Sequence, residues 1–131
     1  MSFGEHVQSA DWKKEKHIPV IEVPEVIEAG KPFMVTVSVG KEIPHPNTTE
    51  HHISWIDVYF KPESEKFLHQ VGHFDFTAHA ESTKGPNEGA VLAHPIATFS
   101  MTIKEPGTLI ALESCNIHGI WENSAELHLS E

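Results

Sequence analysis

The stretch "FMVTVSV", residues 33–39, carries the strongest indication of fold class in the sequence. Its odd-numbered positions hold phenylalanine or valine, whereas its even-numbered positions hold methionine, threonine and serine. A period of two is typical of a strand with one buried face. No window of the sequence shows a sustained helical period. We therefore expect the chain to be built from strands.

Six further runs outside this stretch are also strand-like. They are residues 18–23, 53–60, 67–76, 96–103, 108–114 and 125–130. Turn signals such as "EAGKP", "KPESEK" and "STKGPNEG" separate them. Seven short strands predict an all-β fold, a seven-stranded immunoglobulin-like antiparallel β-sandwich, with residues 1–131 as a single domain. Residues 1–14 form a polar N-terminal arm, which we expect to be the least ordered segment.

Composition and charge exclude several classes of function. The formal net charge is −10, and all nine basic residues are lysines, so nucleic acid is not an expected partner. No run of about 18 apolar residues and no signal peptide is visible, so we expect no membrane association. A single cysteine cannot form an internal disulfide, which suits a reducing compartment. These features favour a cytoplasmic protein.

Three short motifs combine histidine with the lone cysteine: "EKH" at 15–17, "HPNTTEHHI" at 45–53 and "CNIHG" at 115–119. Each motif alone is weak, since a solvated loop or a buried cysteine explains it equally well. All lie at expected strand ends or in loops, so they can converge at one end of a sandwich. Up to four imidazoles and one thiolate exceed a closed structural zinc site and favour a redox metal such as iron.

The motifs leave two questions about the histidines open. The residues themselves do not decide between His51 and His52 as the donor. The other six histidines are interpreted as surface or satisfied core residues. They are His6, His69, His73, His79, His94 and His128.

In their order and spacing, the three motifs resemble the signature of the superoxide reductases, specifically the small one-iron neelaredoxin type of the desulfoferrodoxin family. The resemblance covers nearly the whole chain. Members of the two-iron type add a four-cysteine iron module, which a chain with one cysteine cannot carry. Family members are seven-stranded immunoglobulin-like sandwiches, in agreement with the strand pattern.

The resemblance implies a set of site residues. One mononuclear non-heme iron is expected to be held by His17, His45, His51 and His118, with Cys115 as the axial thiolate; His52 is not a ligand in the family pattern. Glu15 is implied as a further ligand of the ferric state, and Lys16 as the residue that faces incoming superoxide. Lys13 and Lys14 add to a basic patch that would offset the overall negative charge.

The implied function is one-electron reduction of superoxide to hydrogen peroxide. A rubredoxin-like electron donor and a homo-oligomer, with a tetramer favoured, follow from the same resemblance.

Three other functions remain open from the residues alone. A cupredoxin-like electron-transfer protein would need two histidines, a cysteine and a weak axial ligand, commonly methionine, and no methionine follows His118. A cysteine hydrolase would pair Cys115 with a histidine base but would leave the "HPNTTEHH" loop unexplained. A metal-free binding module is the third.

Overall fold

The computed structural model describes residues 1–131 and contains seven strands and one short 3-10 helix. The helix is η1 (Phe3–His6). The strands are β1 (Val20–Glu22), β2 (Phe33–Ser38), β3 (Ile53–Pro62), β4 (His69–Asp75), β5 (Ile96–Met101), β6 (Gly107–Cys115) and β7 (Gly119–Leu127). The structure has no helix of the length and apolarity that a membrane span requires.

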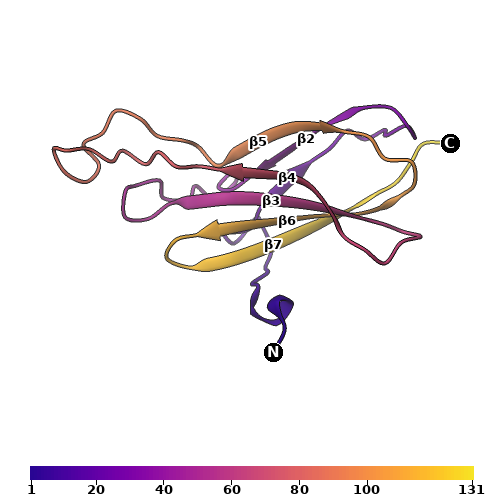
Figure 1. Cartoon of the computed structure of the whole chain (residues 1–131), viewed down its shortest axis with the longest axis horizontal. Helices are drawn as coiled ribbons and strands as arrows, with labels where there is room; N and C mark the ends of the chain where they lie inside the picture. The colour runs from indigo at the N-terminus through magenta and orange to yellow at the C-terminus, as the bar shows by residue number, and fades with distance from the viewer.

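The strands form two antiparallel sheets that pack face to face (Figure 1). One sheet has the order β1-β2-β5 and the other the order β4-β3-β6-β7. The expected all-β sandwich of seven strands is thereby confirmed. At one end of the sandwich lie the β2–β3 connection, the long β4–β5 connection and the β6–β7 turn, on the left in Figure 1.

The core lies between the two sheets and follows the period of two read from the sequence. In β2, Phe33, Val35 and Val37 are buried, while Met34 on the opposite face is exposed. In β6, Leu109 and Ala111 are fully buried. The alternating apolar positions of both sheets therefore close one continuous core.

A β-bulge interrupts the pairing of β3 with β6 between Ile53 and Trp55. Bulges insert an extra residue and re-aim the chain, and they are frequent next to functional sites. This one lies directly after the histidine pair of the β2–β3 connection. It lets Ile53 and Ile56 both enter the core although they are three positions apart.

The last strand differs from its expected position. We expected residues 125–130, whereas β7 spans Gly119–Leu127, and His128 lies just outside it. The first residues of "GIWENSAEL" pair with β6 but remain partly exposed. The segment therefore lacks the alternation of buried and exposed positions by which a strand is recognised. The strand is set by a tight turn after Cys115, in which Gly119 adopts a positive φ of 84° that favours glycine.

The N-terminal arm is attached to the sandwich by a short parallel bridge. The Gln8 amide donates to the carbonyl of Ile120 at 3.0 Å, and the Glu122 amide donates to the carbonyl of Gln8 at 2.9 Å. The arm therefore pairs with the edge of β7 at a single residue, Gln8. This contact supplies the anchor that the sequence did not reveal.

Candidate metal centre

Five side chains with metal-binding donors come from three separate segments at one end of the sandwich. His17 precedes β1, His45 and His51 lie in the β2–β3 connection, Cys115 ends β6, and His118 lies in the following turn. These segments meet because β3 pairs with β6, so that Ile53 lies opposite Cys115. The sheet register thus brings the second motif beside the third.

Four of these residues present their donor atoms to a common point. Ligand atoms of His17, His45, His51 and Cys115 all lie within 4.8 Å of one another. The Nε2 atom of His51 is 3.2 Å from the Cys115 sulfur. His118 joins the rim of this cluster, with its Nδ1 atom 3.2 Å from His17 Nε2 and 3.6 Å from the sulfur.

Hydrogen bonds on the outer side of two imidazoles fix which nitrogen faces inward. His17 Nδ1 donates to the Glu15 carboxylate at 2.7 Å, and His45 Nδ1 donates to the Pro46 carbonyl at 2.7 Å. Their Nε2 atoms are therefore the ones left on the inner side. His45 Nε2 is buried and has no hydrogen-bond partner in the protein. Metal-binding histidines characteristically use one nitrogen for the metal and the other for such a partner.

Burial and nearby basic groups favour the neutral form of His45 and His51. Burial, and to a lesser degree the electrostatic influence of His17, His51 and Lys16, lowers the pKa of His45 to about 4. Burial and the adjacent His118 and Lys16 lower the pKa of His51 as well. Neutral imidazole is the form that binds a metal, so both rings are ready ligands at neutral pH.

The sulfur of Cys115 is held at the end of a tight hairpin. Cys115 pairs with Gly119 across the β6–β7 turn, and the thiol is 2% exposed. The backbone N–H of His118 donates to the sulfur at 3.4 Å. The turn therefore delivers both a sulfur and an imidazole donor from four consecutive residues.

Trp121 orients the first histidine from β7. Its ring stacks on the His17 imidazole with centroids 4.8 Å apart and planes 12° from parallel. Its indole N–H donates to the His118 carbonyl at 3.2 Å. Sequence reasoning did not single out Trp121, although a tryptophan three positions after a candidate ligand was the available signal.

Glu15 and Lys16 lie in a turn beside the donor cluster. Glu15 accepts hydrogen bonds from both the backbone N–H and the ring of His17, so its carboxylate faces the outer nitrogen of that ring. The structure does not bring it into the donor cluster. Lys16 is close enough to contribute to the lowered pKa values of His45 and His51, after burial and the neighbouring imidazoles.

A buried carboxyl group escaped the sequence analysis. Glu113 is fully buried on β6, two residues before Cys115, and neither carboxyl oxygen has a partner. Burial, with a smaller contribution from the charge of Glu15, raises its pKa to about 9, so the group is a neutral acid at pH 7. The signal was a charged residue at a core position of an alternating strand.

The remaining histidines lie outside the donor cluster. His52 turns away from it and donates from Nδ1 to the Thr48 carbonyl at 2.9 Å. His79 is buried with both ring nitrogens hydrogen-bonded. The other five are exposed: His6, His69, His73, His94 and His128.

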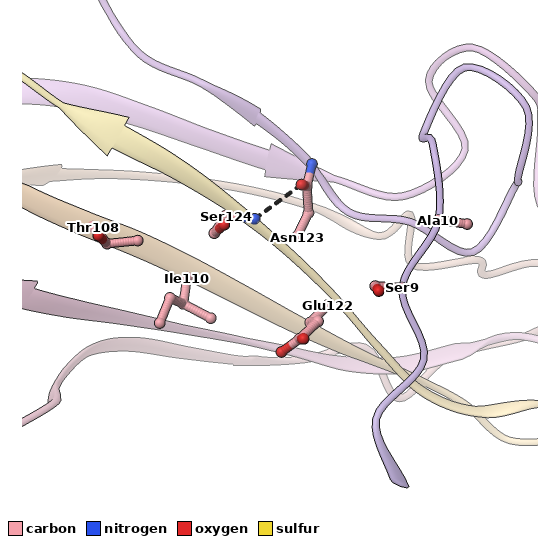
Figure 2. Close-up of a pocket in the computed structure, with 7 residues that line it drawn as sticks. All are labelled: Ser9, Ala10, Thr108, Ile110, Glu122, Asn123 and Ser124. Atoms are coloured by element: carbon pink, nitrogen blue, oxygen red, sulfur yellow. Dashed lines mark hydrogen bonds between the residues drawn. The ribbon is translucent and has the colours of Figure 1, made fainter. Parts of the chain in front are cut away.

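A surface groove of about 450 Å³ lies elsewhere on the molecule, between the arm and the outer face of β6 and β7 (Figure 2). It is lined by Ser9, Ala10, Thr108, Ile110, Glu122, Asn123 and Ser124. The Ser124 amide donates to the Asn123 side chain at 2.9 Å within it. The groove contains none of the nitrogen or sulfur donors, so the candidate site is the cluster and not this groove.

Comparisons with known proteins agree with this picture. The sequence profile described as desulfoferrodoxin matches residues 9–124. Neelaredoxin from Megalodesulfovibrio gigas is 56% identical over 129 residues, covering 98% of this chain and 99% of that protein. Superoxide reductase from Pyrococcus furiosus is 55% identical over 124 residues, covering 95% and 98%. The structure of superoxide reductase (neelaredoxin) from Archaeoglobus fulgidus in the reduced form superposes with a TM-score of 0.88 at 53% identity, covering 94% and 98%.

Proposed function

The chain belongs to the desulfoferrodoxin family, and from that premise we propose that it is a superoxide reductase that uses one mononuclear non-heme iron. The observation that carries the proposal is the convergence of imidazole nitrogens and one thiol on a common point. Buried His45 Nε2, which no protein group satisfies, points into this cluster. An unpaired buried acceptor of this kind is costly unless it has a ligand.

The donors present fit iron. We propose His17, His45, His51 and His118 as nitrogen ligands and Cys115 as the sulfur ligand. Imidazole suits iron, zinc and copper alike, and a single thiolate among several imidazoles is compatible with a redox site. We propose iron over the other two metals, and membership of the desulfoferrodoxin family supports that choice.

Ferrous iron held here would supply one electron to superoxide, which becomes hydrogen peroxide on taking up two protons from water. The protein groups have separable tasks in that reaction. Cys115 donates electron density as a thiolate, the property for which thiolate ligands are used in oxygen chemistry. The histidines would hold the metal without adding negative charge, so the thiolate would be the one anion among the four imidazoles.

Lys16 is proposed to attract superoxide to the site. The chain carries a formal net charge of −10, which would repel an anion. A cation within reach of His45 and His51 acts at short range, where distant surface charges are largely screened. Glu15 is proposed as a carboxylate that reaches the metal in the ferric state. Its side chain already contacts the outer nitrogen of the His17 ring and would have to release that hydrogen bond to reach the metal.

The cupredoxin-like alternative fits the site less well. It would need only two of the histidines, and the three methionines, Met1, Met34 and Met101, lie outside the cluster. A cysteine hydrolase would need an accessible thiol, whereas Cys115 is 2% exposed. The reductase proposal accounts for all the clustered histidines together.

Partners and location are proposed from the family resemblance. A rubredoxin-like protein is the proposed electron donor, and a homotetramer is the proposed assembly. The edges of both sheets, at β1, β5 and β4, offer backbone groups for such association. A lone reduced cysteine ligand is consistent with a cytoplasmic location.

Two measurements test the proposal. Metal analysis of protein purified without added metal is expected to give about one iron per chain. Superoxide generated by pulse radiolysis is expected to disappear with formation of hydrogen peroxide and without release of dioxygen, which separates a reductase from a dismutase. Copper in place of iron, or stoichiometric dioxygen, would overturn the proposal.

A further inference from the structure

The β2–β3 connection carries two proposed donors, His45 and His51, on a stretch without regular secondary structure. Loops are the most mobile parts of a fold, yet a metal ligand must be held within about half an ångström of its working position. Something outside the loop must therefore fix it. The neighbouring β4–β5 connection, residues 76–95, extends past the strand ends beside it (Figure 1).

His79 is one of the residues that join the two connections. Its Nδ1 atom lies 2.9 Å from the side-chain oxygen of Asn47, two residues after His45. Its own carbonyl accepts a hydrogen bond from the Thr49 hydroxyl at 2.6 Å. Its ring stacks on His52, next to His51, with centroids 3.5 Å apart and planes 3° from parallel. His79 thus contacts the β2–β3 connection at Asn47 and Thr49, between the two donors, and at His52, just after them.

Hydrogen-bond partners on both ring nitrogens fix the orientation of the His79 ring. The Asn47 amide nitrogen already donates to the Ala93 carbonyl at 3.0 Å, so its oxygen is the acceptor for His79. The other ring nitrogen lies 2.6 Å from the Phe76 carbonyl, which can only accept. The His79 ring is therefore held from both of its nitrogens.

The β4–β5 connection is itself built rigidly around this residue. His79 forms an antiparallel bridge with Leu92, and its amide donates to the Glu81 carboxylate at 2.7 Å. Ala80, buried beside it, has a φ of 62°, a backbone conformation that costs energy for a residue other than glycine. Such strain persists only where surrounding contacts over-determine the chain. The segment is therefore a firm support and not a loose loop.

We propose that His79 is a positioning residue of the metal centre: it holds the β2–β3 connection against the β4–β5 connection and thereby sets the positions of the His45 and His51 donors. This inference rests on the proposed metal site but adds a residue that contacts neither the metal nor its ligands. Its effect passes through Asn47, Thr49 and His52.

The experiment measures metal affinity and site geometry directly, with Co²⁺ as the probe, so that it does not depend on superoxide chemistry. His79→Leu removes both hydrogen bonds of the ring, whereas His79→Gln keeps one donor. His94→Ala is the matched control, since His94 lies on the same connection but is exposed. His51→Ala provides the reference for loss of a ligand.

We expect His79→Leu to raise the Co²⁺ dissociation constant about tenfold, the lower end for residues that orient metal ligands. The sulfur-to-cobalt charge-transfer band should shift, because the imidazole positions change. His79→Gln should recover part of both effects, and His94→Ala should match wild type. A role limited to folding would instead lower the melting temperature of the metal-free protein while the folded variant kept wild-type affinity and spectrum, and that result would overturn the proposal.

Two further outcomes separate this inference from the proposed function. Wild-type protein that binds Co²⁺ with sulfur coordination but does not reduce superoxide after iron loading would refute the reductase function and leave the His79 test valid. Wild-type protein that fails to bind Co²⁺ would refute both. If His79→Leu does not fold, Asn47→Ala removes the same hydrogen bond from the loop side and is expected to show the same loss of affinity.

Discussion

The two ends of the sandwich are held together by different kinds of contact. At the end farther from the donor cluster, apolar side chains from both sheets close the core, with Phe60 opposite Leu109 in the register of β3 and β6. At the donor end, polar side chains link the connections to one another. The Asn116 side chain accepts from the His52 amide and donates to the Glu50 carbonyl, and its backbone amide donates to the His52 carbonyl.

This difference indicates how stability and chemistry are divided in the molecule. Apolar burial is non-directional and tolerates small shifts, whereas hydrogen bonds fix both distance and orientation. The apolar end can therefore supply most of the folding free energy, while the polar end places the donors. Substitutions at the two ends should accordingly affect different measurements.

The largest effect is expected at the donor end, from Cys115→Ser. The substitution nearly preserves shape, so the melting temperature of the metal-free protein should change little. The sulfur-to-iron charge-transfer band should vanish and the superoxide reduction rate should fall by orders of magnitude, because the thiolate donor is lost. Absorption spectra and pulse radiolysis measure both. A serine variant that kept its colour and rate would show that Cys115 is not a ligand.

The converse effect is expected at the apolar end, from Leu109→Ala. Leu109 is fully buried, and truncation of such a leucine costs about 2–5 kcal/mol of unfolding free energy. The folded fraction should keep the wild-type iron spectrum. Urea denaturation of this variant and of Ile110→Ala, on the partly exposed face of the same strand, gives the comparison. A changed iron spectrum in Leu109→Ala would mean that the two ends are not independent.

A smaller, severalfold effect is expected from Lys16→Ala on the bimolecular rate with superoxide, with a weaker dependence on ionic strength. Lys31→Ala removes the same charge near the start of β2, away from the donors, and serves as the control. We expect that variant to react at the wild-type rate. Equal slowing in both variants would assign the effect to net charge and refute local attraction by Lys16.

The smallest effect is expected on the outer face of the four-stranded sheet, at His73. Hydrogen bonding to Asp57, and less to Asp75, raises the pKa of His73 above its ordinary value. A raised pKa in the folded state stabilises the protein at low pH, and the contribution is lost as pH rises from about 6.5 through the folded pKa. The melting temperatures of wild type and His73→Gln should therefore converge towards alkaline pH. A constant difference across pH would contradict this.

The sequence allowed the strand pattern to be predicted, because burial on one face imposes a period of two that Phe33, Val35 and Val37 display. It did not locate the start of β7, since the residues around Trp121 pair in the sheet while remaining partly exposed. The donor residues were named through local motifs and family resemblance. Trp121 and Glu113 each left a local signal but were missed, because the contacts that give them a role depend on register between strands.

The register of the β6–β7 hairpin also bears on the order of folding. Cys115 and His118 lie at a tight turn, and β-hairpins form within about 1–10 μs. His17 must meet His118 across 101 positions of sequence, a contact that carries a large loop-closure entropy and forms late. The sulfur and one imidazole are thus expected to be in place before the first strand docks, so the full donor set, and with it tight retention of the metal, would mark the end of folding.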